Sequence, residues 1–426
     1  MKKQFIFDSY NFDHTTKTLS LTYGFDDDIR FTETYTFDFD FSDNYSDVAF
    51  QRACESLFFM AGVSYYKAFL AREIVIKSGT MDHKSAHFYS KTYERGLGEF
   101  FYLNELDPRQ QITFPFTHET IEPELIEDSE GLLIGIGGGK DSLVSVELLR
   151  DHEKVATWSV GHRSQLEPLI DTIGLPHYWV ERSIDPLLIE LNKQGALNGH
   201  IPISAILACV GAVIAVLTGH RDVVVSNENS ANEPTLNYEG MAINHQYSKS
   251  LEYEKDFQEH LQLLFGDSLR YYSFLRPLSE VHIAEIFARV GFGKYKDVFS
   301  SCNRAFTQGN KEIFWCGECS KCAFVFLAFT PFISSGQLES LFHSKNLLRH
   351  AQLEPTYRNL LGIEGEKPLD CVGEIKESRE AMRLAEKYYP ELAQKYTFEI
   401  PEDYSYKHLS NHSMPEDIHF YLTQAL

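Results

Sequence analysis

Basic residues are scarce in this chain of 426 residues, where 39 Lys and Arg stand against 61 Asp and Glu. The resulting formal charge of −22 disfavours a nucleic-acid partner, because such partners are usually bound on a basic face that releases counterions. Hydrophobic residues make up 43% of the chain and aromatic residues 14%, which excludes a wholly disordered protein. The chain is longer than one ordinary core requires, so two or three domains are expected.

The sequence also lacks the segments that direct a protein to a membrane. Residues Met1 to Asp8 contain no apolar h-region and no small-residue cleavage site. The longest apolar run, Ile201 to Leu217, is shorter than the roughly 20 residues that span a bilayer, and it contains Pro202 and Ser204, so a buried helix is expected there. Seven cysteines, an odd number, favour thiols or metal ligands in a reducing compartment over disulfides. We therefore expect a cytoplasmic protein without a membrane span.

Three regions of different pattern divide the chain. Residues 1–120 are expected to form an α+β domain, because alternation at period 2 up to residue 47 predicts a three-stranded antiparallel meander and helices follow at 48–73 and 84–103. Residues 121–330 alternate short apolar runs with helices, which predicts a doubly wound parallel sheet with its site at the carboxyl ends of the strands. Residues 331–426 are expected to be helical. The expected parallel strands are 132–136, 155–160, 177–180 and 223–225, and the expected helices are 142–151, 163–173, 185–193, 249–265 and 377–388.

One predicted strand-to-helix junction carries three consecutive glycines. The apolar run Leu132 to Ile136 leads into Gly137-Gly138-Gly139-Lys140-Asp141-Ser142. Residues without a Cβ let successive backbone N–H groups converge on a tetrahedral anion, and the new helix points its positive end to the same place. The spacing is neither that of a Walker loop nor that of a Gly-x-Gly-x-x-Gly site. We interpret the junction as a phosphate-binding loop; the alternative is a tight turn without a ligand.

Four of the seven cysteines lie between positions 302 and 322. Cys316, Cys319 and Cys322 form two overlapping Cys-x2-Cys steps, and Cys302 precedes them. A two-residue gap lets two sulfurs reach one ion, and four thiolates suit a closed, structural Zn²⁺ site. The alternative is a set of small buried residues, since free cysteine is often interior. We predict that all four are metal ligands.

The glycine loop resembles the Ser-Gly-Gly-x-Asp-Ser signature of the PP-loop ATP pyrophosphatases, in which the loop holds pyrophosphate while ATP adenylates an acceptor oxygen. The resemblance implies ATP and Mg²⁺ as cofactors, with Asp141 a partner for the metal ion. Gly137 stands at the usual serine position, which removes one hydroxyl donor but leaves the backbone cradle. The cysteine cluster is similar to the zinc cluster of 7-cyano-7-deazaguanine synthases, a branch of the same superfamily.

The order of motifs along nearly the whole chain resembles the UDP-N-acetylmuramoyl-L-alanyl-L-glutamate epimerases, the MurL family. Besides the phosphate loop, the segments that carry the resemblance are Ala61–Lys67, Ser226–Asn232, Trp315–Phe329 and Lys367–Glu374. The resemblance implies a PP-loop (adenine nucleotide α-hydrolase-like) domain. It also implies an ATP-dependent inversion of the terminal L-Glu of UDP-MurNAc-L-Ala-L-Glu through an acyl-adenylate, in the synthesis of peptidoglycan precursors. The implied partner is this small UDP-linked muramoyl dipeptide.

The resemblance and the expected topology together indicate where ligands bind. The loop would hold the ATP phosphates and the end of the second parallel strand would meet adenine. The candidates for cofactor binding are Gly137, Gly138, Gly139, Lys140, Asp141, Ser142, Gly161 and His162. The candidates for substrate binding are Asn227, Asn229, Asn232, Arg276 and Arg304. The asparagine loop could equally be a series of Asn-based turns, and arginines at a surface are often only solvated.

Inversion requires two groups on opposite faces of one carbon. Cys371 and His245 are the first candidates for these proton transfers, because a thiol near a cation and an imidazole can both titrate near neutral pH. Glu228, in the loop after the strand at 223–225, is the third. The alternative for each is a packing or capping role.

Other functions are compatible with the same motifs. A PP-loop ligase that adenylates another small carboxylic acid would also release pyrophosphate, but only an epimerase returns its substrate with an unchanged composition. A tRNA-modifying PP-loop enzyme would require RNA binding, which the acidic charge disfavours. A nucleotide-binding module without activity is suggested by Gly137 in place of serine.

Overall fold

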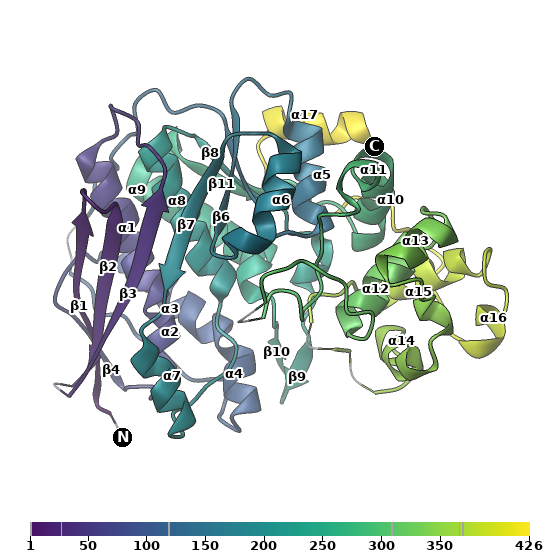
Figure 1. Cartoon of the computed structure of the whole chain (residues 1–426). Coiled ribbons are helices and arrows are strands. Elements are labelled where there is room, and N and C mark those ends of the chain that lie inside the picture. Colours follow the sequence, from purple (N-terminus) through teal and green to yellow (C-terminus); the bar gives the residue numbers. More distant parts are fainter. Residues whose placement is uncertain (1, 27, 118–119, 308–309, 366, 369) are drawn as a thin grey trace.

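The computed structural model describes residues 2–26, 28–117, 120–307, 310–365, 367–368 and 370–426. Of the residues used above, Met1 and Leu369 lie outside this part of the chain. The architecture is mixed α/β: one large sheet has helices on both sides, and the C-terminal helices gather beyond one end of it (Figure 1).

Nine strands form the sheet, in the order β11-β8-β5-β6-β7-β3-β2-β1-β4. Neighbouring strands from β11 to β7 are parallel, and β3 pairs with β7 in antiparallel. The predicted meander and all four predicted parallel strands are present, and the meander continues the parallel sheet. The bounds are β1 Gln4–Asp13, β2 Thr18–Phe25, β3 Ile29–Asp38, β4 Glu73–Ile76, β5 Leu132–Gly135, β6 Val155–Val160, β7 His177–Ser183, β8 Asp222–Val225 and β11 Arg270–Ser273.

Helices connect and cover the strands. The helices α1 to α9 are Asp47–Ala61, Val63–Tyr66, His83–Gly96, Gly98–Leu103, Lys140–Leu149, Arg163–Ile173, Pro186–Lys193, Ile203–Thr218 and Leu251–Phe265. The helices α10 to α17 are Glu280–Val290, Phe292–Tyr295, Ser320–Phe329, Ser335–Leu341, Glu354–Leu360, Ile375–Ala385, Leu392–Lys395 and Glu416–Ala425. The helices predicted at 163–173 and 185–193 agree with α6 and α7 to within one residue, and the region after 331 is helical as expected.

Both faces of the parallel strands are buried. Leu133 and Val223 belong to the core that includes α1, α8 and α9, whereas Leu132 and Ile134 belong to the opposite core, which includes α5, α6 and α10. Alternation along a strand explains this split, because successive side chains point to opposite faces. The sheet is therefore covered on two sides over its parallel part, as the near-continuous apolar strands indicate.

The long apolar run lies inside the protein. It forms α8, whose side chains from Ala208 to Leu217 are buried against the sheet and α1. Within the described residues, no helix has the length and apolar character that crossing a bilayer requires.

The structure contains four strands that were not predicted from the sequence. β4 and β11 are four residues each and pair with distant strands, and β9 (Leu236–Tyr238) and β10 (Met241–Ile243) form a separate two-stranded hairpin. Short strands such as these carry too few residues for an alternating pattern to be detected. The hairpin and α4 lie near the carboxyl ends of the parallel strands, toward the lower edge of Figure 1.

Candidate active site

The glycine loop connects β5 to α5. Gly138 has a φ of +89°, and a Cβ there would lie 2.7 Å from the Cζ atom of Phe306, whereas a Cβ on Gly137 would meet nothing within 4 Å. Gly139 precedes α5 without a side-chain cap, and none of the three glycine N–H groups donates a hydrogen bond within the described chain. The loop thus presents free amides at a helix N-terminus, an arrangement that binds anions.

The end of β6 lies beside this loop. Gly161 and His162 both have a positive φ, of +65° and +54°, and a Cβ on Gly161 would face open space. The His162 ring meets Phe306 edge-on at a centroid distance of 5.5 Å, and Phe306 is also the nearest neighbour of Gly138. The two predicted nucleotide-binding segments are therefore brought together.

Lys140 does not point freely into this space. Its side chain is buried, its Nζ atom lies 2.5 Å from Asp141, and it also contacts Glu280 at the start of α10. Burial lowers the pKa of Lys140, but the two carboxylates outweigh burial and raise it. Burial raises the pKa of Glu280, but Lys140 and Lys321 outweigh it and lower it to about 2. Lys140, Lys321 and Glu280 are buried and Asp141 is half-buried, and together they form a group of two cations and two carboxylates.

A chain of contacts continues from this group to Cys371. Lys321, in the first turn of α12, lies 3.4 Å from Glu280 and donates a hydrogen bond to the backbone carbonyl of Cys371. The Cys371 Sγ atom lies 3.1 Å from the Nζ atom of Lys249. Lys249 ends a single helical turn before α9, so residues from three distant parts of the chain meet at one thiol.

Cys371 and His245 are brought together. Burial raises the pKa of Cys371, but the cation of Lys249 and a hydrogen bond with His245 outweigh it and lower this pKa to about 6. Burial lowers the pKa of His245, but hydrogen bonds with Cys371 and Glu99 outweigh it and raise this pKa to about 9. Near neutral pH the pair is therefore a thiolate beside an imidazolium, and a thiolate is the reactive form of cysteine.

Glu228 is buried in the loop after β8. Its carboxylate accepts hydrogen bonds from the backbone N–H and the hydroxyl of Ser230. Burial and the nearby charge of Glu280 raise the pKa of Glu228 to about 7, although the Ser230 hydrogen bonds oppose them. Glu228 also contributes to the raised pKa of Lys249, which indicates that the two side chains are neighbours. A carboxyl group with this pKa can accept or donate a proton at neutral pH.

The asparagines of the same loop make local hydrogen bonds. Asn229 and Asn232 lie in a short 3-10 turn, the Asn229 side chain donates to Glu374 at 3.3 Å, and Asn232 accepts from the N–H of Leu251 at 2.7 Å. The Asn227 carbonyl accepts from Ser273 at 2.5 Å. These hydrogen bonds fit the interpretation as Asn-based turns, and substrate binding by the loop stays a prediction.

Arg276 and Arg304 differ in their surroundings. Arg276 is 0% exposed; its guanidinium pairs with Glu254 at 2.9 Å and donates to the carbonyls of Glu228 and Lys249. It therefore holds the two loops that carry Glu228 and Lys249. Arg304 is exposed and pairs with Glu318 at 2.7 Å.

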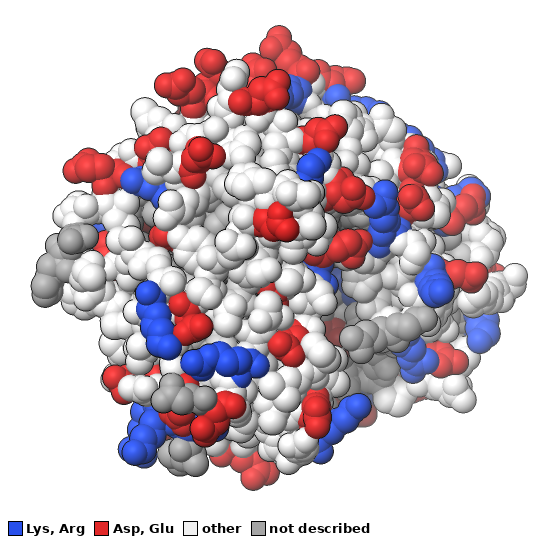
Figure 2. Space-filling view, turned by 60° about the vertical axis from the view of Figure 1, so that its left-hand side comes forward, with Lys and Arg blue, Asp and Glu red and all other residues white. Residues whose placement is uncertain are grey.

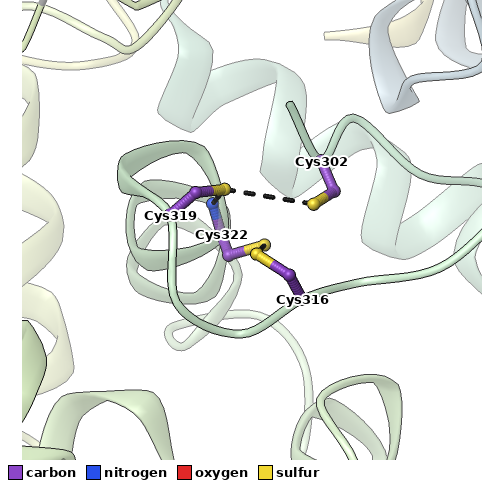
Figure 3. Close-up of side chains that lie close together, drawn as sticks. All are labelled: Cys302, Cys316, Cys319 and Cys322. Atoms are coloured by element: carbon purple, nitrogen blue, oxygen red, sulfur yellow. Dashed lines mark hydrogen bonds between the residues drawn. The ribbon is translucent and has the colours of Figure 1, made fainter. Parts of the chain in front are cut away.

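The four predicted metal ligands converge (Figure 3). Cys302 and Cys319 are separated by 4.0 Å between sulfurs, Cys316 and Cys322 by 3.7 Å, and all four sulfurs lie within 4.8 Å of one another. A tetrahedral ion with metal–sulfur bonds of about 2.3 Å places its sulfurs about 3.8 Å apart. The cluster can therefore hold a metal ion such as Zn²⁺, and Cys319 at the start of α12 ties it to the helix that carries Lys321.

Several residues of this site were not found from the sequence. Lys249, Glu99 and Glu280 belong to no motif with a characteristic spacing, and Glu99 meets His245 from 146 positions away. One signal was present: Glu99 stands beside Phe100 and Phe101 in an apolar helix, and a buried carboxylate in such surroundings needs a partner.

Comparisons with known proteins show the family to which the chain belongs. Residues 1–274 match the model of the MurL N-terminal domain and residues 298–399 that of the MurL C-terminal domain. A protein of Salinispora tropica is 39% identical over 89% of this chain and 84% of its own length. A protein of Xanthomonas oryzae pv. oryzae is 41% identical over 78% of this chain and 74% of its own. Both are named UDP-N-acetyl-alpha-D-muramoyl-L-alanyl-L-glutamate epimerase. No solved structure matches significantly. The chain belongs to the MurL family.

Proposed function

We propose that this protein is an ATP-dependent epimerase that inverts the terminal L-Glu of UDP-MurNAc-L-Ala-L-Glu and releases AMP and pyrophosphate. The names of the family relatives support the substrate. The observation that carries the proposal is the unbroken chain of contacts from Lys140 of the glycine loop through Glu280 and Lys321 to the backbone carbonyl of Cys371. A group that activates a carboxylate and a group that moves its neighbouring proton must act on the same few atoms.

In the proposed reaction, adenylation by ATP makes the α-proton of the terminal glutamate more acidic. The proton α to an ionised carboxylate is very weakly acidic, because the carbanion would form beside a negative charge. When the carboxylate oxygen attacks the α-phosphorus of ATP, pyrophosphate leaves and the acyl group loses its charge. A base then removes the α-proton, an acid returns a proton to the opposite face, and water releases AMP.

The glycine loop is the proposed site of the phosphates. The free amides of residues 137–139 and the N-terminus of α5 provide donors without a charged side chain. Asp141 is the proposed ligand of Mg²⁺, an ion that prefers carboxylate and phosphate oxygens. The open space beside Gly137 and Gly161 gives the nucleotide room along the edge of the sheet.

Cys371 is the proposed base of the inversion. Its thiolate, stabilised by Lys249, can take the α-proton at neutral pH. His245 and Glu228 are the candidates for the opposing acid, since both carry a proton near neutral pH. The cysteine cluster is proposed to hold a structural Zn²⁺ that fixes the start of α12, and thereby Lys321.

Chiral analysis of the product tests the proposal. The protein is incubated with ATP, Mg²⁺ and UDP-MurNAc-L-Ala-L-Glu, and the glutamate released by hydrolysis is resolved into its enantiomers. We expect D-Glu together with AMP and pyrophosphate; L-Glu alone would refute the function. A product of changed mass would indicate a ligase. Cys371→Ala should still release pyrophosphate but incorporate no solvent deuterium at the α-carbon.

A further inference from the structure

A buried carboxylate stands behind the imidazole that faces Cys371. Glu99 lies in α4, between the buried residues Gly98 and Phe100, and is itself 6% exposed. Its carboxylate contacts the Nδ1 atom of His245, which follows β10. With Nδ1 engaged by Glu99, Nε2 is the nitrogen left for the thiol of Cys371, which lies close enough for the two groups to shift each other's pKa. The order carboxylate, imidazole, thiol is that of an activated nucleophile or base oriented by a third group.

The surroundings of His245 favour its charged form. The His200 ring packs against it, with ring centroids 4.3 Å apart and an interplanar angle of 42°. Burial, and next the positive charge of His245, lower the pKa of His200 to about 4, so His200 is neutral and adds no second cation at physiological pH. Lys249 contacts the thiol of Cys371 and Lys321 its backbone carbonyl, and the charge of Cys371, followed by those of Glu228 and Asp141, raises the pKa of Lys249. The carboxylate of Glu99 is thus the negative group in direct contact with the ring.

We propose that Glu99 is a positioning residue, which orients the imidazolium of His245 toward Cys371 and so maintains the thiolate. This inference rests on the proposed function in one respect, because the proposed epimerisation is what gives the thiolate a role as a base.

A metal ion between Glu99, His200 and His245 is the competing interpretation, because one ligand atom of each lies within 4.8 Å of the others. In the structure the Glu99 carboxylate contacts Nδ1 of His245 directly, whereas a bound ion would hold the two atoms apart. The experiment below includes this outcome.

The test measures the thiol without any substrate. Iodoacetamide alkylation of Cys371 is followed by peptide mass spectrometry from pH 4.5 to 9.5 in the full-length protein and in Glu99→Gln, which keeps the size of the side chain. We expect the midpoint of alkylation to rise by about one pH unit, a tenfold loss of thiolate on the acidic side. Glu105→Gln, an exposed residue at the end of the same helical segment, should leave the midpoint unchanged.

His245→Gln provides a second variant should Glu99→Gln fail to fold. Its midpoint should rise at least as far, because it removes the cation itself. An unchanged midpoint in Glu99→Gln, or stoichiometric metal that is lost in His200→Ala but kept in Cys319→Ser, would overturn the inference. Pyrophosphate release should persist in Glu99→Gln, while epimerisation falls about twofold at pH 7 and about tenfold at pH 5. If the alkylation midpoints move as expected but the unaltered protein epimerises nothing, the proposed function fails and the role of Glu99 stands.

Discussion

Removal of the cation beside Cys371 should raise the pKa of the thiol. Lys249 lies 3.1 Å from the sulfur, and the pKa of Cys371 is about 6. Two unit charges at this distance interact by about 1.3 kcal/mol in water and by about 5 kcal/mol at an effective dielectric constant of 20. At 1.36 kcal/mol for each pKa unit, Lys249→Met should raise the thiol pKa by roughly one to four units, and we expect about two.

This shift has a definite direction in pH. Since the thiolate is the charged form, loss of a nearby cation moves its appearance to higher pH. At pH 7 a pKa near 6 leaves about 90% of the thiol ionised, whereas a pKa near 8 leaves about 10%, so alkylation and deuterium exchange at pH 7 should fall about tenfold. Both rates should recover as the pH is raised toward 9.

Peptide mass spectrometry of alkylated Cys371 measures the midpoint, and solvent-deuterium incorporation into the substrate measures the proton transfer. Lys255→Met is the matched control, because Lys255 is an exposed lysine of α9, six positions from Lys249. A midpoint that stays near pH 6 in Lys249→Met would show that Lys249 does not stabilise the thiolate. A midpoint that moves without any change in deuterium exchange would remove Cys371 from the reaction.

Three further substitutions test the framework of the site. Gly138→Ala should abolish pyrophosphate release and cost roughly 1–3 kcal/mol of stability, because its positive φ and Phe306 both exclude a Cβ; thermal unfolding measures the second effect. Arg276→Met should lower the free energy of unfolding in urea by about 3–5 kcal/mol, because it leaves the buried Glu254 without its cation. Cys319→Ser should reduce bound zinc from about one equivalent to none in elemental analysis, since a closed site needs all four thiolates.

Each of these three substitutions has a matched control variant. Gly137→Ala should retain the stability of the unaltered protein, because a Cβ there meets nothing. Arg304→Met removes an exposed ion pair and should cost less than about 1 kcal/mol. Cys371→Ser should keep its zinc. Equal unfolding energies for the two arginine variants, or full zinc in Cys319→Ser, would contradict these interpretations of the structure.

Local sequence patterns were sufficient to predict most of the fold. The apolar run at 132–136, the glycines after it and the polar-apolar alternation of the first 40 residues each depend on neighbours in sequence, and the corresponding elements are present. β11 is too short to show an alternating pattern, and it opens with Arg270, which pairs with Asp222 of the neighbouring strand β8 and with Asp417. The sequence contains no local sign of the ion pair with Asp222, whose partners lie 48 positions apart.

The candidate site likewise contains residues that local patterns predicted and residues that they could not predict. The phosphate loop and the cysteine cluster have characteristic spacings, so their residues could be named in advance and the four sulfurs do converge. Cys371 and His245 were predicted only as residue types suited to proton transfer, and their proximity depends on the fold. Lys249 and Glu99 could not be predicted, because a lysine or glutamate acquires its role from a contact 122 or 146 positions away.

The net charge of −22 can be reconciled with a site for anions because the cations of the site are buried and already paired. Acidic side chains are spread over the face shown in Figure 2 and gather along its upper edge. Inside, Lys140 and Lys321 are balanced by Asp141 and Glu280, so this group offers an incoming phosphate almost no net charge. In the proposed function, attraction would come from the backbone amides of the glycine loop and from a divalent cation held by Asp141. Recognition of this kind selects small anions that enter with a metal ion and disfavours long polyanions, which would meet the acidic exterior first.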